Sequence, residues 1–276
     1  MKKVYEIIFS PTGHSKKAAE LIAGELIAGE LRGQKKTVDL CLTGDEERET
    51  AIEAGSICVF SVPCYGGRVP QTAAERILKR IKAPQGKEKI PAIICVTYGN
   101  RAFEDALLEL ADLVEKAGFR VAAAAALVAE HNIVHEFAAG RPDEKDEQQI
   151  RAFAAKARQF LNEGAESGLK KGAESGLTIP GNRPYKTWKA SAPDIIVDKS
   201  TCVYCGMCAL KCPTAAISKD GQRVDRGKCI GCMRCLAICR SRSLPPAYVS
   251  GLREKIAPAC QGRKENLFFL PSDACK

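Results

Sequence analysis

Two cysteine runs with the same spacing constrain this chain more than any other feature. Each run has the pattern C-x2-C-x2-C-x3-C, and together they use eight of the 14 cysteines in the 276-residue sequence. The first run is Cys202, Cys205, Cys208 and Cys212, followed by Pro213, and the second is Cys229, Cys232, Cys235 and Cys239. Gaps of two residues let a tight loop direct three thiolates at one metal centre, while the longer gap carries the fourth cysteine to a neighbouring centre.

Crossing the fourth cysteines gives two ligand sets, each suited to one [4Fe–4S] cluster. The first set is Cys202, Cys205, Cys208 and Cys239, and the second is Cys229, Cys232, Cys235 and Cys212. Structural zinc and unliganded buried cysteine are the alternatives. Zinc sites use paired C-x2-C knuckles, which two runs of four cysteines with C-P after the first fit poorly. Ligand thiols must stay reduced, so the sequence predicts a reducing compartment and, by default, the cytoplasm.

Length and charge limit the remaining function classes. With 45% hydrophobic and 27% charged residues, the chain has enough apolar material for packed cores, and its length suits two domains. No apolar run approaches the roughly 20 residues that span a bilayer, so we expect no membrane span. The formal net charge of +9 fits a surface for an acidic redox partner or an anionic cofactor. We expect no nucleic-acid partner, because no recognised motif accompanies the charge, and a homodimer is left open.

Short apolar strands alternate with amphipathic helices in the first part of the chain. Strands are expected at residues 4–9, 38–42, 57–63, 92–97 and 121–129, and helices at 15–31, 71–81, 103–117 and 142–161. This alternation predicts an α/β fold, a flavodoxin-like doubly wound parallel sheet of five strands with helices on both faces. The expected divisions are this unit at 1–162, a linker at 163–190, a small α+β domain with the cysteine runs at 191–245, and a tail without assigned role at 246–276.

Three loops follow the carboxyl ends of strands, the edge where open α/β sheets bind ligands. The first, Ser10–Ser15, is rich in hydroxyls and lacks the glycine patterns of dinucleotide sites and P-loops. It suits one phosphate monoester at a helix N-terminus, although Ser and Thr also cap helices without a ligand. The loops Pro63–Pro70 and Tyr98–Asp105 contain glycines that let backbone approach a flat ring, with Tyr65 or Tyr98 stacked on it. Simple turns with a packing tyrosine are the alternative.

The motifs Ser-Pro-Thr-Gly-His-Ser, Tyr-Gly-Gly-Arg-Val-Pro and Tyr-Gly-Asn-Arg together resemble the flavodoxin half of fused flavodoxin–ferredoxin proteins of anaerobic microbes. The cysteine domain resembles bacterial two-cluster ferredoxins, with Arg240 in place of the usual proline. The resemblance covers nearly the whole chain and implies FMN. It implies a phosphate site at Ser10, Thr12, Gly13, His14 and Ser15 and a ring site at Pro63, Cys64, Tyr65, Gly66, Gly67, Thr97, Tyr98, Gly99, Asn100 and Arg101. His14 and the basic net charge depart from ordinary flavodoxins.

These features predict an electron-transfer protein that relays electrons between FMN, two [4Fe–4S] clusters and an external redox partner. No side chain that would activate a substrate is evident, so no catalytic residue is assigned. A flavin-dependent reductase or dehydrogenase for a small substrate, and a redox-sensing regulatory or scaffold protein, are the alternatives. Basic residues near the cysteines, including Arg234 and Arg242, would raise cluster potentials, form a docking face for an acidic partner, or simply be solvated. His131 follows the last strand, where a surface position is expected over a flavin contact.

Overall fold

A mostly parallel sheet forms the centre of the protein in this computed structural model, which describes residues 3–28, 33–42, 49–86, 88–166, 176–187 and 192–271. Across those ranges the main sheet has six strands in the order β10-β7-β6-β4-β1-β2. They are β1 (Lys3–Ile8), β2 (Gln34–Asp39), β4 (Ile57–Pro63), β6 (Pro91–Tyr98), β7 (Arg120–Val128) and β10 (Leu267–Phe269). All except β10 pair in parallel, and their order by chain position, 2-1-3-4-5, is that of flavodoxin-like domains. The predicted fold class is confirmed.

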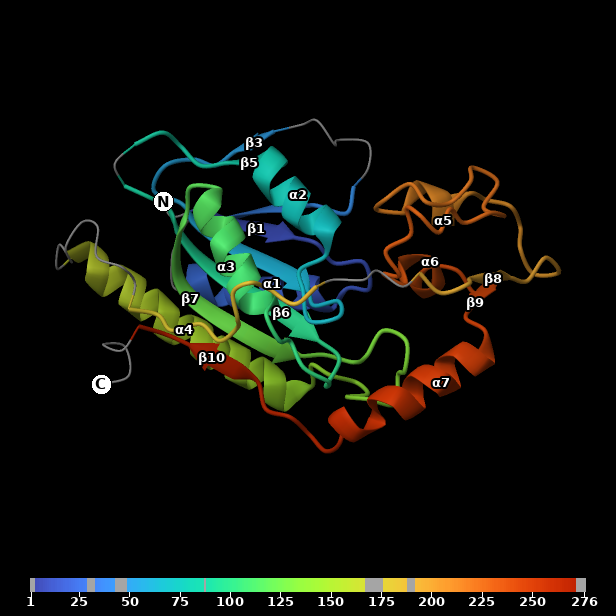
Figure 1. The fold of residues 1–276 in the computed structure, drawn as a ribbon. Helices are drawn as coiled ribbons and strands as arrows, with labels where there is room; N and C mark the ends of the chain where they lie inside the picture. The colour runs from blue at the N-terminus through green and yellow to red at the C-terminus, as the bar shows by residue number, and fades with distance from the viewer. Residues whose placement is uncertain are drawn as a thin grey trace.

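Helices cover both faces of this sheet (Figure 1). They are α1 (His14–Ile27), α2 (Gln71–Arg80), α3 (Ala106–Lys116) and α4 (Glu144–Glu166). Successive strand side chains point to opposite faces, so Tyr5 of β1 packs in the core under α2 and α3. Its neighbour Val4 packs in the core under α1 and α4. Because the strands are parallel, the loops at their carboxyl ends meet at one edge.

The second strand lies earlier in the chain than the sequence pattern predicted. The apolar residues pointed to a strand at 38–42, but β2 covers Gln34–Asp39 and exposes its first four side chains. As the edge strand, β2 is defined by backbone pairing with β1 and not by burial of its side chains. Leu40 and Cys41 are buried in the loop that follows. A separate parallel pair joins β3 (Thr50–Ala51) to β5 (Ile81–Lys82).

The cysteine runs fold into a small domain beside the sheet (Figure 1). Its elements are β8 (Ile196–Val197), α5 (Met207–Leu210), α6 (Arg234–Ala237) and β9 (Arg242–Ser243). β8 and β9 pair antiparallel and bring the two ends of the domain together. α5 and α6 each begin after a left-handed residue, Gly206 with φ 69° and Met233 with φ 60°. The two cysteine runs therefore fold in the same local way.

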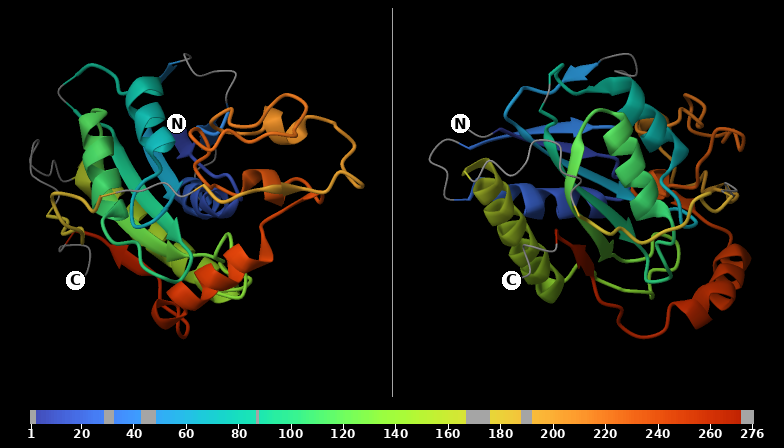
Figure 2. Two further views of the ribbon diagram at one scale, coloured as in Figure 1. Left: turned by 45° about the vertical axis from the view of Figure 1, so that its right-hand side comes forward. Right: turned by 60° about the vertical axis from the view of Figure 1, so that its left-hand side comes forward.

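The tail after residue 245 returns to the sheet (Figure 2). α7 (Pro246–Ile256) and the short 3-10 helix η1 (Ala257–Ala259) lead to β10, which pairs antiparallel with β7. The five expected parallel strands are present, and β10 adds a sixth, antiparallel strand that the sequence pattern did not predict. The sixth strand is only three residues long, and its pairing depends on a contact with a distant part of the chain.

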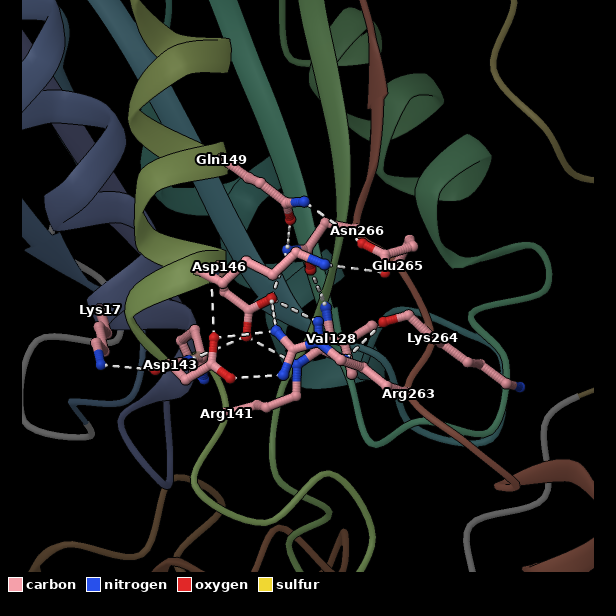
Figure 3. Close-up of polar contacts among 12 residues, drawn as sticks. Lys17, Val128, Arg141, Asp143, Asp146, Gln149, Arg263, Lys264, Glu265 and Asn266 are labelled. Atoms are coloured by element: carbon pink, nitrogen blue, oxygen red, sulfur yellow. Dashed lines mark hydrogen bonds and ion pairs between the residues drawn. The ribbon is translucent and has the colours of Figure 1, made fainter.

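A polar network holds the tail against the sheet (Figure 3). The buried N–H of Val128 donates to Asn266 Oδ1 at 2.9 Å, and Asn266 Nδ2 donates to Asp146 Oδ1 at 2.9 Å. Arg141 pairs with Asp146 at 2.5 Å, and Arg263 pairs with the same carboxylate at 3.1 Å. Burial raises the pKa of Asp146, but the hydrogen bonds from Arg141, from the Asp143 N–H and from Asn266 outweigh burial and lower the pKa. The tail is thus an integral part of the first domain.

The described residues of the expected linker pack along α3. The Asn182 N–H donates to Asp105 Oδ1 at 2.9 Å, and Arg183 pairs with Asp112 at 2.5 Å. Residues 167–175 and 188–190 of the linker lie outside the described residues. α4 continues to Glu166, past the boundary expected at 162. Among the described helices, none is long and apolar enough to cross a membrane.

Candidate functional site

A pocket lies at the carboxyl edge of the parallel strands, where the loops after β1, β4, β6 and β7 meet. It holds about 350 Å³ of empty space, part of which is open to solvent. The lining residues are Ser10, Pro11, Thr12, His14, Ser15, Pro63, Cys64, Tyr65, Thr97, Tyr98, Gly99, Ala129, Glu130 and Asn132. Ten of the fifteen residues expected to contact FMN are in this lining.

The loop after β1 presents hydrogen-bond donors at the start of α1. Gly13 adopts φ 99°, and the space where a Cβ would stand is open. The Lys16 N–H donates to Ser10 Oγ at 2.9 Å, whereas the N–H groups of His14 and Ser15 have no acceptor within the helix. Because Ser10 Oγ accepts that bond, its own proton is available to a ligand. With no acidic residue in the first turn, this helix end suits an anion.

The other hydroxyls of this loop already have partners. Ser15 Oγ and Thr97 Oγ1 are buried and lie 2.7 Å apart, so this pair ties α1 to β6. Thr12 Oγ1 lies 3.4 Å from His14 Nδ1. Burial lowers the pKa of His14, so the imidazole is neutral at neutral pH. His14 therefore offers an anion a hydrogen bond and not a full charge.

The two tyrosines considered for ring stacking have different surroundings. Tyr98 is 6% exposed and packs against Phe103, with ring centroids 5.5 Å apart. Tyr65 is half-buried in the pocket lining, and its N–H donates to the carbonyl of Arg68 at 2.9 Å. Burial raises the pKa of Tyr65 well above its usual range, so the phenol stays protonated. Tyr65 is the better candidate to stack on a flat ligand.

Five of the residues expected to contact FMN lie outside the pocket lining, namely Gly13, Gly66, Gly67, Asn100 and Arg101. A Cβ at Gly67 would lie 1.8 Å from Glu104 Oε2, so protein packing alone requires this glycine. Arg101 pairs with the same Glu104 at 2.9 Å. Asn100 Nδ2 donates to the carbonyl of Cys260 at 2.7 Å, which directs this side chain to the tail.

The loop after β7 supplies pocket residues that sequence reasoning missed, including Glu130, which accepts from the Gly140 N–H at 2.8 Å. That backbone bond lowers the pKa of Glu130 and keeps it ionised. The neighbouring His131 accepts at Nδ1 from the N–H groups of Ile133 (3.2 Å) and Val134 (3.1 Å). Burial lowers its pKa to about 4. The expected surface histidine is therefore a neutral structural acceptor. The loop after β7 could have been predicted to line the pocket, because ligands of open α/β sheets bind at the carboxyl ends of the strands.

A second cavity, also of about 350 Å³, lies in the small domain. Its lining includes all four members of the second predicted ligand set, Cys212, Cys229, Cys232 and Cys235. Burial raises the pKa of Cys232 to about 12 and that of Cys235 to about 11, and the nearby Cys212 raises both further. Cys212 comes from the other run, as the crossed ligand scheme requires. A cavity lined by four cysteines from both runs could hold a [4Fe–4S] cluster.

The first predicted ligand set is Cys202, Cys205, Cys208 and Cys239. Cys208 is buried, and its Sγ accepts from Arg242 NH2 at 3.2 Å. Cys202 Sγ accepts from Gln222 Nε2 at 3.6 Å, and Cys205 is exposed. Within the described residues, no three His, Cys, Asp or Glu side chains are grouped as ligands of a single metal ion.

Arg234 and Arg242 were considered for a docking face; Arg242 is buried, and Arg234 is half-buried. Arg242 is 6% exposed and donates to Cys208 Sγ and to the carbonyl of Gly221. Arg234 lines the cysteine cavity, and its charge opposes the rise in the Cys41 pKa that burial causes. Burial of Arg242 excludes it from a docking face, whereas the role expected for Arg234 stays a prediction. Positive charge beside the thiols would favour the reduced, more negative state of a metal centre bound there.

Residues 194–240 match the family model of the 4Fe-4S dicluster domain. The chain is a flavodoxin-like domain followed by a ferredoxin-like domain. A solved flavodoxin from the domain Archaea is 12% identical over 59% of this chain and 99% of its own, with a TM-score of 0.35. Oxidised flavodoxin 1 from Bacillus cereus is 14% identical over 58% of this chain and 98% of its own, with a TM-score of 0.35. The apo form of the NADH:FMN oxidoreductase EMOB is 16% identical over 58% of this chain and 90% of its own, with a TM-score of 0.41. No curated protein matches the sequence. The strand order, and not these similarities, carries the fold assignment.

The pocket of the flavodoxin-like domain and the cysteine cavity of the ferredoxin-like domain are neighbours. Pro213 and Ile230, in the lining of the cysteine cavity, both contact the flavodoxin-like domain. Arg76 NH2 donates to the carbonyl of Pro213 at 2.7 Å. Ile230 packs against the apolar core of the flavodoxin-like domain. The second ligand set therefore faces this domain, while Cys205 is exposed to solvent.

Proposed function

We propose that the protein is an electron-transfer iron–sulfur flavoprotein that binds FMN in the flavodoxin-like pocket and two [4Fe–4S] clusters in the ferredoxin-like domain. The observation that supports this most directly is the contact between the two domains, where Arg76 of the flavodoxin-like domain donates at 2.7 Å to the carbonyl of Pro213, in the lining of the cysteine cavity. FMN exchanges one or two electrons and each cluster exchanges one, so adjacent sites suit an electron relay.

Each proposed site uses side chains with suitable chemistry. Ser10, Thr12 and the first N–H groups of α1 would hold the FMN phosphate, and Tyr65 would stack on the ring. The second ligand set, Cys212, Cys229, Cys232 and Cys235, would hold the inner cluster, nearest the flavin. The first set, Cys202, Cys205, Cys208 and Cys239, would hold the outer cluster. Because these thiols must remain reduced, we place the protein in the cytoplasm.

The test is an anaerobic purification of the full chain, with iron, sulfide and flavin assayed on one sample. We expect about eight irons with matching sulfide and one FMN per chain. Partial reduction followed by optical and electron paramagnetic resonance spectroscopy should then show electrons shared between flavin and clusters. Iron without flavin, or zinc in place of iron, would contradict the proposal. Sustained oxidation of a nicotinamide donor by a small substrate would instead identify a reductase.

A further inference from the structure

Apolar side chains are exposed around the first cysteine run. Five of the eight large apolar residues that are exposed in the described ranges belong to the ferredoxin-like domain and lie within or beside its cysteine runs. They form what we term the apolar patch: Val203, Tyr204, Met207, Leu210 and Ile238. Val203 is 80% exposed and Leu210 65% exposed. Isolated exposed apolar residues are common, but a group of this kind marks an interaction surface.

The residues of the apolar patch lie next to members of the first ligand set along the chain. Val203 and Tyr204 lie between Cys202 and Cys205, and Cys205 is itself exposed. The remaining patch residues flank Cys208 on α5 or precede Cys239 directly, and α5 contacts α6. Pro213 and Ile230, next to Cys212 and Cys229 of the second ligand set, contact the flavodoxin-like domain instead. The outer cluster is therefore the one that an external protein can approach.

Basic side chains border the apolar patch. Lys199 and Lys211 precede and follow the first three cysteines of the run, and Arg240 follows Cys239. The carbonyl of Lys219 lies 3.1 Å from the position of a Cβ on Gly206, which places this lysine beside the patch. Within the described residues these four basic side chains have no ion pair.

The acidic residues of this region are engaged by their own loops. Asp198 accepts from the N–H of Ser200 at 2.9 Å and from its hydroxyl at 2.6 Å, which lowers the pKa of Asp198. Asp220 accepts from Ser218 Oγ and from the N–H of Gln222. From residue 194 to 240 there are eight basic and four acidic residues. The border of the patch is therefore positive.

We propose that the apolar patch is the docking surface for an acidic electron-transfer protein, which exchanges electrons with the outer cluster. The inference rests on the proposed function. One electron leaves the reduced centre of the partner and enters the outer cluster, and no bond forms or breaks. An apolar centre with a charged rim is the usual form of a specific interface, and the rim charge speeds association with a partner of opposite sign. A second copy of this chain, with the same charge of +9, would bring like charges together.

The probe for the test is a reduced bacterial two-cluster ferredoxin of net negative charge, mixed with the full cofactor-loaded chain. Two double variants alter the surface: Val203→Ser with Leu210→Ser, and Lys199→Glu with Lys211→Glu. The matched controls are Leu267→Ser on β10, also exposed, and Lys116→Glu with Lys156→Glu, which makes the same charge change on α3 and α4. Binding is measured by titration and by zero-length carbodiimide cross-linking mapped to lysines. Electron transfer is measured by stopped flow.

We expect saturable binding, with cross-links at Lys199 and Lys211. The charge variant should lose about tenfold in second-order rate at low ionic strength and recover at high salt. The apolar variant should lose affinity at every salt concentration. Equal losses in the controls, no saturable binding, or a patch that binds anionic lipid vesicles in place of ferredoxin would overturn the proposal. Iron and flavin content and reduction by dithionite should be unchanged in each variant. Failure of the wild-type chain to bind these cofactors would instead contradict the proposed function.

Discussion

Arg76 of α2 donates a hydrogen bond to the carbonyl of Pro213 at 2.7 Å, across the boundary between the two domains. The same guanidinium donates to the carbonyl of Leu40 at 2.7 Å, and the residue is 8% exposed. Pro213 directly follows Cys212, the thiol that crosses into the second ligand set. A buried arginine of the flavodoxin-like domain thus holds a residue in the lining of the cysteine cavity of the ferredoxin-like domain.

Replacing this arginine should loosen the contact between the domains. Arg76→Met leaves buried carbonyls without their donors, so we expect a loss of about 1–3 kcal/mol in the free energy of unfolding and slower exchange of electrons between flavin and clusters. The control is Arg158→Met, because Arg158 donates to the carbonyls of Glu25 and Ala28 within one domain. Urea unfolding and stopped-flow spectroscopy measure the two effects. An equal slowing of electron exchange in both variants would argue against a positioning role.

The cysteine cavity predicts how iron content responds to single substitutions. Cys232→Ser should remove the inner cluster and lower iron and sulfide by about half, because the first ligand set keeps its four thiols. Cys95→Ala is the control, since Cys95 is fully buried within β6 and outside both runs. Iron and sulfide analysis with electron paramagnetic resonance measures the outcome. Full iron content in the Cys232 variant would refute its role as a ligand.

The parts of this fold that the sequence predicted depend on local patterns. The continuous apolar run of β4 was placed at its observed bounds, 57–63, because a strand buried on both faces needs little context. β10 was missed because its pairing with β7 depends on Asn266 and other distant contacts. Asn100 was assigned to the flavin from its loop alone, whereas its partner Cys260 lies at the other end of the chain. Non-local contacts of this kind leave no periodic signal.

The phosphate loop can be tested by comparing two flavins. Thr12→Val and Ser10→Ala should each weaken FMN binding about tenfold, the effect of losing one hydrogen bond to a charged group. Riboflavin, which lacks the phosphate, should bind these variants as it binds the wild type. Ser10→Ala also removes the acceptor of the Lys16 N–H and should cost about 1 kcal/mol of stability. Fluorescence titration of the flavin-free protein measures both affinities. Parallel losses for the two flavins would indicate a distorted pocket and not a phosphate contact.

The polar network of the tail predicts a stability effect far from either cofactor site. Asn266→Ala leaves the buried N–H of Val128 without an acceptor and removes a donor to Asp146. We expect a loss of about 1–3 kcal/mol in the free energy of unfolding, with faster hydrogen exchange along β7. Gln261→Ala, at an exposed position of the same segment, is the control. Unchanged exchange in β7 would show that β10 adds nothing to the stability of the sheet.

His131 makes stability depend on pH. Its Nδ1 accepts from two backbone N–H groups, so protonation there destroys both bonds, and burial lowers the pKa of His131 to about 4. The unfolded chain, with a histidine pKa near 6.5, binds this proton more tightly. The contribution is therefore fully present above about pH 6.5 and is lost as the pH falls towards 4, by about 3 kcal/mol in all.

His131→Asn keeps an acceptor that does not titrate, so its unfolding free energy should change less between pH 6.5 and 4 than that of the wild type. The pKa of His14 is also lowered by burial, so His14→Asn is measured beside it to separate the two contributions. Urea unfolding at a series of pH values gives both slopes. A slope unchanged by His131→Asn would mean that the neutral imidazole is not what holds the loop after β7, and with it one wall of the flavin pocket.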